Sequence, residues 1–147
     1  MAGSVKPIPD GYHTITPYLA VQGASKLLDF LKRTFDAEVV ERLERPDGSL
    51  GHAEVKIGDS RLMVGEPGDP AQVMPAMLYA YVSDVDATYQ RALAAGAVSL
   101  QAPADQFYGD RNAGVQDPFG NRWWVATHKE DVSPEEMKRR AAAQMKK

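Results

Sequence analysis

The sequence contains no cysteine, and this absence removes several kinds of chemistry at once. Disulfide frameworks, thiolate nucleophiles and cysteine-ligated zinc all require that side chain. Long apolar runs are missing too, so we predict neither a signal peptide nor a membrane span, and we expect a cytoplasmic protein. The net charge of −3 provides no cationic footprint for nucleic acid, so no nucleic-acid partner is expected.

The sequence motifs of several enzyme classes are also missing. The chain has no Gly-x-Ser-x-Gly nucleophile elbow, no phosphate-binding loop and no dinucleotide glycine fingerprint. Nucleophilic hydrolysis and nucleotide-dependent chemistry therefore find no support. What remains is an ordinary globular composition, with 44% hydrophobic and 25% charged residues, and a length of 147 residues that fits one compact domain.

Within that length the sequence repeats itself. The segments LAVQGASKLLDFLKRTFDAEVV and AYVSDVDATYQRALAAGAVSL each indicate a strand, a turn, an amphipathic helix and a second strand. Val21 and Val82 are 61 residues apart, and so are Arg61 and Arg122 within the matching segments GDSRLMV and FGNRWWV. One offset therefore relates the starts and the ends of two copies of one unit. A cleft between two such copies is a natural ligand site. Chance similarity is the alternative interpretation.

The predicted elements follow this repeat. We expect an extended arm over 1–12, a first module over 13–66, a linker over 67–75, a second module over 76–128 and a C-terminal helix over 129–147. Strands are predicted near 13–21, 38–44, 52–57, 61–65, 77–83, 98–101, 113–116 and 122–127, with helices over 25–35 and 84–95. Pro17 indicates that the first strand lies at a sheet edge or a bulge. Asp84 is expected to cap its helix, and Gly96 to end it in a left-handed conformation.

A family resemblance is carried by four ordered segments of the chain, which are GYHTITPYLAV, PDGSLGHAEVKIGDS, DQFYGDR and DPFGNRWWVATHKEDVSPEEM. The sequence resembles the vicinal oxygen chelate superfamily, and more specifically its PhnB-like, glyoxalase/bleomycin-resistance-like subgroup. The resemblance implies an α+β fold of two βαβββ modules, with curved mixed sheets, helices on the outer face and usually a homodimer. Because this fold hosts unrelated chemistries, it does not by itself define an activity.

The superfamily's metal positions are where this sequence departs from its relatives. In the metal-dependent members, ligands project from the first and last strands of each module. The resemblance carries these four positions onto Thr16, Met63, Met77 and Trp124. Zinc, iron and manganese favour imidazole or carboxylate ligands, which none of these side chains supplies. We therefore expect neither a metal nor another cofactor.

Strand parity predicts which side chains face the concave side of each sheet. The expected concave set is Thr16, Tyr18, Met63, Met77, Tyr79, Tyr81 and Trp124. The opposite parity, expected under the helices, takes Ile15, Leu19, Val21, Leu62, Val64, Trp123 and Val125. Methionine and aromatic side chains offer a polarizable surface for flat organic ligands. The alternative is that the concave set simply fills a closed core.

Three polar residues complete the predicted ligand-binding set. His52 and Glu54 alternate on one strand face, where they form either a two-ligand or acid–base pair or part of a solvated face. Arg111, in the segment FYGDR, either holds an anionic or carbonyl group of a ligand or pairs with Asp110 to order its loop. No catalytic residue is identified.

The leading hypothesis is a homodimeric small-molecule-binding protein that sequesters an aromatic or hydrophobic ligand without a metal. The alternative is a divalent-metal-dependent lyase, isomerase or dioxygenase of the same superfamily that uses displaced ligands such as His52, Glu54 and Glu66. A third possibility is a dimeric scaffold with a closed cavity that binds nothing.

Overall fold

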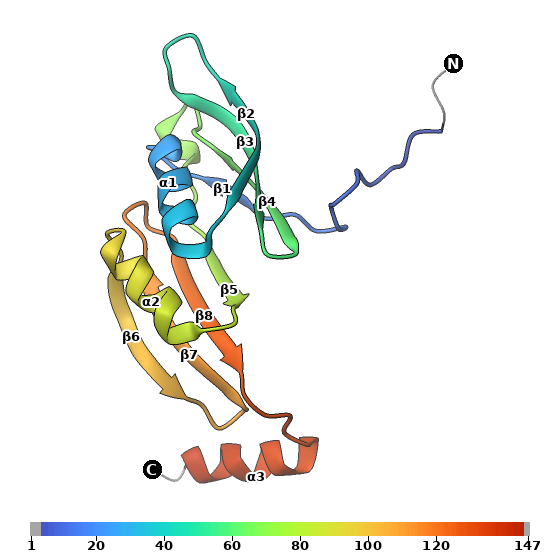
Figure 1. Ribbon diagram of the computed structural model, residues 1–147, viewed down its shortest axis with the longest axis vertical. Coiled ribbons are helices and arrows are strands. Elements are labelled where there is room, and N and C mark those ends of the chain that lie inside the picture. Colours follow the sequence, from blue (N-terminus) through green and yellow to red (C-terminus); the bar gives the residue numbers. More distant parts are fainter. Residues whose placement is uncertain (1–3, 146–147) are drawn as a thin grey trace. The chain divides into compact units, whose positions relative to one another are not determined.

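The structure is a computed structural model that describes residues 4–145 (Figure 1). The chain divides between Ala76 and Met77 into two compact modules, each built on one four-stranded mixed sheet. This confirms the expected α+β architecture of two βαβββ modules. No helix within residues 4–145 is long and apolar enough to cross a membrane.

The first module follows the predicted element order. Its elements are β1 (Tyr18–Ala20), α1 (Ala24–Phe35), β2 (Glu38–Glu44), β3 (Leu50–Ile57), β4 (Ser60–Gly65) and a short 3₁₀ turn, η1 (Pro70–Gln72). The strands lie in the order β1-β4-β3-β2, with β1 parallel to β4 and the other pairs antiparallel. The crossover from β1 to β2 runs through α1, whose buried leucines pack against β3 and β4.

The second module repeats this arrangement. Its elements are β5 (Met77–Tyr81), α2 (Val85–Ala94), β6 (Val98–Asp105), β7 (Asp110–Gln116), β8 (Arg122–His128) and α3 (Pro134–Met145). The strands lie in the order β5-β8-β7-β6, and β5 is again parallel to its neighbour. Asp84 accepts a hydrogen bond from the Ala87 amide at 3.1 Å, and Gly96 has a φ of 106°, so both predicted ends of α2 are confirmed.

The strand register shows the repeat directly. Tyr18 lies opposite Met63 between β1 and β4, and Tyr79 lies opposite Trp124 between β5 and β8. The members of these two pairs are separated by the same 61 residues that relate the two sequence segments. The two modules therefore share one backbone frame, and corresponding positions in it can be compared side chain by side chain.

The predicted helix-facing set is buried, with one exception. Leu19, Val21, Leu62, Val64, Trp123 and Val125 are all at most 5% exposed. Ile15 is 84% exposed, so its assignment to this set was wrong. The first strand begins at Tyr18 rather than at residue 13, because Pro17 has no amide hydrogen for the ladder and contributes only its carbonyl, which accepts from Met63 N at 2.9 Å. The strand lies at the sheet edge, as Pro17 predicted.

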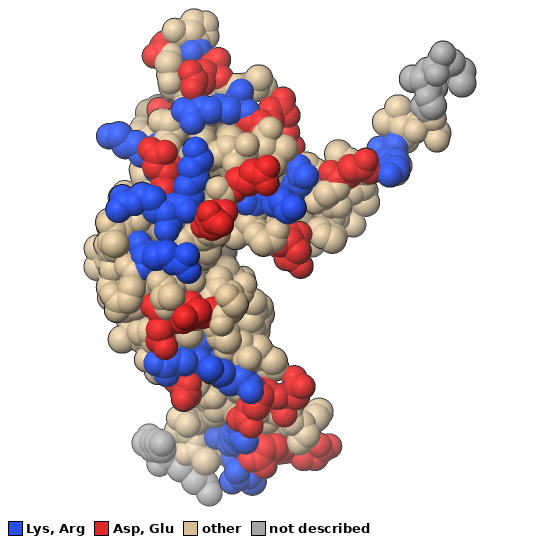
Figure 2. Space-filling view, in the orientation of Figure 1, with Lys and Arg blue, Asp and Glu red and all other residues tan. Residues whose placement is uncertain are grey.

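Charged side chains of both signs are interspersed over the face of each module shown in Figure 2. On that face the described residues form no large patch of a single sign.

The turn between β7 and β8 is held by the buried side chain of Asp117. One carboxylate oxygen accepts from the Phe119 and Asn121 amides at 2.9 and 3.0 Å. The other accepts from Asn121 Nδ2 at 3.0 Å and from Trp123 Nε1 at 2.9 Å. Because these donors lie in or beside the core, the carboxylate ties the turn to the packing under α2.

We predict that Asp117→Ala lowers the free energy of unfolding by about 3 kcal/mol, because it leaves several donors without a buried acceptor. Urea denaturation followed by circular dichroism measures this loss. Asp59→Ala, at the exposed turn between β3 and β4, is the matched control and should change the stability by less than about 0.5 kcal/mol. Equal losses in the two variants would contradict the assigned role of Asp117.

Candidate functional site

The candidate site is the helix-free face of the second module's sheet. Helix α2 packs against β6, β7 and β8 on one face, which carries Trp123, Val125 and Ala113. Along each strand the alternate side chains point to the other face. We call this other face the open face of the second module.

An aromatic row occupies the strands β5 and β8 on the open face. Its members are Met77, Tyr79, Tyr81 and Trp124, four of the residues that the sequence assigned to ligand binding. Met77 is 70% exposed, Tyr81 is 64% exposed, and the Tyr79 and Tyr81 rings lie 5.3 Å apart between centroids. The row is therefore not buried within the described chain, which argues against the closed-core interpretation for this module.

Two small residues give the row its shape. The Trp124 ring lies over Gly114 on β7, where a Cβ atom would come within 2.6 Å of a ring carbon. Ala126 lies opposite both Tyr81 and Asn112, and its methyl side chain leaves room above it for larger side chains, which cover it completely. Tyr79 and Tyr81 cross that space to reach polar groups on β7.

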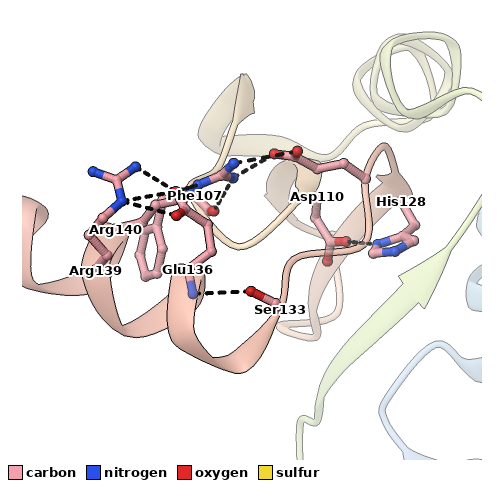
Figure 3. A network of polar contacts seen from close by, with 8 residues as sticks. Phe107, Asp110, His128, Ser133, Glu136, Arg139 and Arg140 are labelled. Atoms are coloured by element: carbon pink, nitrogen blue, oxygen red, sulfur yellow. Dashed lines mark hydrogen bonds and ion pairs between the residues drawn. The ribbon is translucent and has the colours of Figure 1, made fainter.

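Those polar groups are centred on the carboxylate of Asp110, which is only 5% exposed. Its Oδ2 accepts from the hydroxyls of Tyr79 and Tyr81 at 2.7 and 3.0 Å. Its Oδ1 contacts His128 Nδ1 at 2.8 Å (Figure 3). Burial opposes ionisation, but these hydrogen bonds outweigh it and hold the pKa of Asp110 below its ordinary value.

His128 lies between two carboxylates. Its Nδ1 faces Asp110 and its Nε2 faces Asp131, each at 2.8 Å. Both ring nitrogens can donate only in the imidazolium form, and the hydrogen bonds to Asp110 and then to Asp131 raise the pKa of His128. The sequence analysis assigned no role to His128, and the contact appears only once β7 and β8 pair.

Asn112 extends the network toward β6. Its amide nitrogen donates to the hydroxyls of Tyr79 and Tyr108 at 3.2 and 2.7 Å. Its carbonyl oxygen accepts from Gln101 at 2.9 Å and from Gln106 at 3.1 Å. The sequence analysis considered Asp110 only as a loop partner of Arg111 and did not consider Asn112, because β7 was predicted to begin at residue 113, although the parity of Gly114 places both on the open face.

The loop that carries Tyr108 is attached to the C-terminal helix. Arg140 of α3 donates to the carbonyl of Phe107 at 3.0 Å and pairs with Glu130 (Figure 3). Glu136 pairs with Arg139 and Arg140, and its amide donates to Ser133 Oγ at 3.2 Å. Helix α3 contains no buried residue, and these polar contacts attach it to the loop.

The helix-free face of the first module has a different composition. Tyr18 lies beside His52, with 5.9 Å between ring centroids, and opposite Met63. Thr16 is half-buried and precedes β1. Glu54 lies opposite Met63 on β3. Five of the residues assigned to ligand binding from the sequence therefore lie in the first module, four of them on neighbouring strands of its sheet and Thr16 just before β1.

Glu54 anchors the predicted N-terminal arm. The Tyr12 hydroxyl donates to the Glu54 carboxylate, and the Arg61 guanidinium lies 5.5 Å from the centre of the Tyr12 ring. Burial, followed by the hydrogen bond to Glu54, raises the pKa of Tyr12 to about 12. The Tyr12 hydrogen bond lowers the pKa of Glu54, and the interaction with Glu54 raises the pKa of Glu41. No sequence signal pointed to Tyr12.

Two residues considered from the sequence lie away from these faces. Arg111 points to the helix side of its sheet, where it pairs with Asp86 at 3.0 Å and Asp105 at 3.3 Å rather than with Asp110. Glu66 accepts from the amides of Gly23 and Ala24 at 2.9 and 3.3 Å. It thereby caps the start of α1, because the N-cap residue Gly23 has no side chain that could do so. Arg111 therefore lies apart from the other predicted ligand-binding residues, and Glu66 serves α1 instead of a ligand site.

The residues present do not fit a metal. The four superfamily positions offer a hydroxyl, two thioethers and an indole, which are poor ligands for zinc, iron or manganese. The displaced ligands considered from the sequence do not form a metal site either. Glu66 accepts hydrogen bonds at the start of α1, which leaves only His52 and Glu54 together on β3. Within residues 4–145 no three His, Asp or Glu side chains are placed to hold an ion.

Comparison with known proteins agrees with this fold. Residues 11–125 match the family model of the Glyoxalase/Bleomycin resistance protein/Dioxygenase superfamily. The chain is 34% identical to the uncharacterized protein Mb0911c of Mycobacterium bovis, over 98% of both chains. It is equally identical to the uncharacterized protein Rv0887c of Mycobacterium tuberculosis, over 98% of this chain and 88% of that one.

Solved structures show the same likeness. TioX from Micromonospora sp. ML1 has a TM-score of 0.67 and 29% identity, covering 79% of this chain and 98% of that chain. The PhnB protein from Bacillus cereus has a TM-score of 0.66 and 18% identity, covering 78% of this chain and 99% of that chain, which shows a shared fold. The chain belongs to the glyoxalase/bleomycin resistance protein/dioxygenase superfamily, as its sequence resemblance predicted.

The contacts of His128 predict a pH-dependent stability. Because its pKa is raised in the folded state, the stabilisation is fully present below the unfolded pKa of about 6.5 and is lost as the pH rises through the folded value. The difference in Tm between the wild type and His128→Asn should therefore be larger at pH 6 than at pH 9.

His13→Asn is the control for this experiment, since His13 has no carboxylate contact in the described part of the chain. Differential scanning calorimetry of the three proteins at both pH values provides the comparison. A difference between wild type and His128→Asn that does not change with pH would contradict the assigned contacts.

Proposed function

We propose that this protein binds a flat aromatic or hydrophobic small molecule on the open face of its second module, without a metal. The aromatic row is the observation that carries the proposal. Met77, Tyr79 and Tyr81 each keep more than 40% of their surface exposed, although they lie within a regular sheet. Contiguous exposed apolar groups of this kind mark ligand or partner sites.

The composition of the row favours a flat ligand. Tyrosine and tryptophan rings stack on planar molecules and keep a polar edge, while methionine adapts its shape to the ligand. The hydroxyls of Tyr79 and Tyr81 are held by Asp110, so the two rings are oriented before a ligand arrives. Such preorganisation reduces the entropy that binding costs.

The proposal is metal-independent because of the side chains at the superfamily positions. Met77 and Trp124 stand where metal-dependent relatives place imidazole or carboxylate, and both belong to the aromatic row. The same substitutions that remove a coordination site thus build an apolar one. Capture of a ligand, rather than metal-assisted chemistry, is the function that these residues support best.

We also propose that the chain forms a homodimer, as the family resemblance implies. Apolar side chains remain exposed on the outermost strands β2 and β6, among them Leu43 at 57% and Val98 at 67%. Multi-angle light scattering of the purified protein should yield twice the mass of the chain, 16.1 kDa. A monomeric mass across the micromolar range would refute this part of the proposal.

Binding is expected for at least some members of a panel of fused-ring compounds that includes naphthalene, quinoline, acridine and anthraquinone derivatives. A saturating ligand at 100 times its Kd should stabilise the folded state by about 2.7 kcal/mol, which appears as a raised Tm. Met77→Lys should weaken binding about tenfold, because it replaces an apolar contact with a hydrated charge.

Met74→Lys is the matched control for Met77→Lys, since Met74 is equally exposed, at 73%, and lies outside the aromatic row. This variant should bind like the wild type. A panel without a single stabilising compound, or equal losses in the two variants, would contradict the proposed site.

Metal content separates the proposal from a metal-dependent activity. Protein purified without chelator should contain far less than one equivalent of zinc, nickel, iron or manganese per chain, measured by elemental mass spectrometry. A stoichiometric ion that disappears in His52→Ala would overturn the metal-independent proposal and favour a lyase, isomerase or dioxygenase with displaced ligands.

A further inference from the structure

The hydrogen-bond network under the aromatic row restricts the chemistry of the ligand, and this inference rests on the proposed function. A carboxylate can only accept hydrogen bonds, whereas a phenol hydroxyl both donates and accepts. Asp110 faces His128 at Oδ1, and despite its burial its hydrogen bonds lower its pKa, so its Oδ2 accepts from the hydroxyls of both Tyr79 and Tyr81. Each of these tyrosines has thereby used its single hydrogen.

The orientation of Asn112 follows from this assignment. Because Tyr79 has spent its hydrogen, its oxygen can only accept from Asn112, which must turn its NH₂ group toward β5. The second hydrogen of that group reaches the Tyr108 oxygen at 2.7 Å. The carbonyl of Asn112 then faces the NH₂ groups of Gln101 and Gln106 and accepts a hydrogen bond from each.

The donors and acceptors of the Asn112 side-chain amide are therefore all paired, and the directions of the hydrogen bonds around it are fixed. Both hydrogens and both lone pairs of the Asn112 side-chain amide are used, and Asp110 accepts from three side chains. Buried polar groups satisfied in this way resist rearrangement. A ligand consequently meets these groups in the one arrangement that the network allows.

Tyr81 is the member of this network whose hydroxyl a ligand can reach. It is 64% exposed, and its oxygen has no partner other than Asp110 within residues 4–145. Its remaining lone pairs can only accept. Donation to a carboxylate also increases the negative charge on the phenol oxygen, which strengthens it as an acceptor. Tyr108 differs, because it accepts from Asn112 and its own hydrogen has no acceptor in the described part of the chain, so it can donate.

We propose that the open face of the second module selects flat aromatic ligands that carry an N–H or O–H group at the ring edge, and that Tyr81 Oη is the acceptor of that hydrogen. The rings of Tyr79, Tyr81 and Trp124 supply a stacking surface that does not distinguish such ligands from their methylated forms. Tyr81 supplies the distinction, because an ether or N-methyl group offers it no hydrogen.

The test compares 2-naphthol with 2-methoxynaphthalene, which share one fused ring system and differ in the presence of the hydroxyl hydrogen. Titrations at pH 7 followed by ¹H–¹⁵N NMR, including the indole N–H signals, yield a Kd for each compound. The wild type should bind 2-naphthol about fivefold more tightly, the ratio that one net hydrogen bond supplies.

Tyr81→Phe should reduce this ratio to about one by weakening 2-naphthol binding alone. Tyr108→Phe is the matched control: it removes a hydroxyl from the same network but not the acceptor, so the preference should persist. Circular dichroism verifies that both variants are folded. A preference that survives in Tyr81→Phe would overturn the assignment to Tyr81, because a steric origin does not require the phenol oxygen.

The outcomes distinguish this inference from the proposed function. Equal affinity of the wild type for the two naphthalenes would refute selection by Tyr81 while leaving aromatic binding intact. Failure of both naphthalenes and of the whole fused-ring panel would refute the proposed function, and selection by Tyr81 with it.

Discussion

The buried carboxylate of Asp110 is the group on which the open face of the second module depends. It lies opposite His128 across the β7–β8 pair and accepts from two tyrosines that reach it from β5 over Ala126. A buried charge is tolerated only when it is paired and hydrogen-bonded, and here three donors from two strands meet that requirement. The rings, the amide of Asn112 and the end of β8 all take their positions from this one group.

The two modules show how one backbone frame carries different chemistry. Tyr18 and Tyr79 occupy corresponding positions, but the neighbour of the first is Met63 and that of the second is Trp124. The residue two places after Tyr18 is Ala20, whereas the residue two places after Tyr79 is Tyr81. The first module accordingly presents charged groups around Glu54, and the second presents an aromatic row. Family membership defines the frame, while these exchanges decide what it holds.

Much of the fold could be predicted from local patterns. Alternation along β4 and β8 placed Leu62, Val64, Trp123 and Val125 in the core, and each is buried. The pattern failed at Ile15, where Pro17 shortens the strand, because alternation has no meaning outside a strand. Asp110 and Asn112 were not placed on the open face for a related reason: strand boundaries are set by pairing with neighbours, and β7 extends three residues further than its own sequence indicates.

The sequence by itself determined the two-module architecture, the faces of the central strands and the caps of α2. The faces and the caps depend on periodicity or residue type within a few positions of the chain, and the two modules are visible as a repeat at one fixed offset. Only the tertiary structure decided that Asp110, Asn112 and His128 form a network with Tyr79 and Tyr81, and that Arg111 and Glu66 serve the helices instead. Those contacts join residues up to 43 positions apart, and the pairing of strands brings them together.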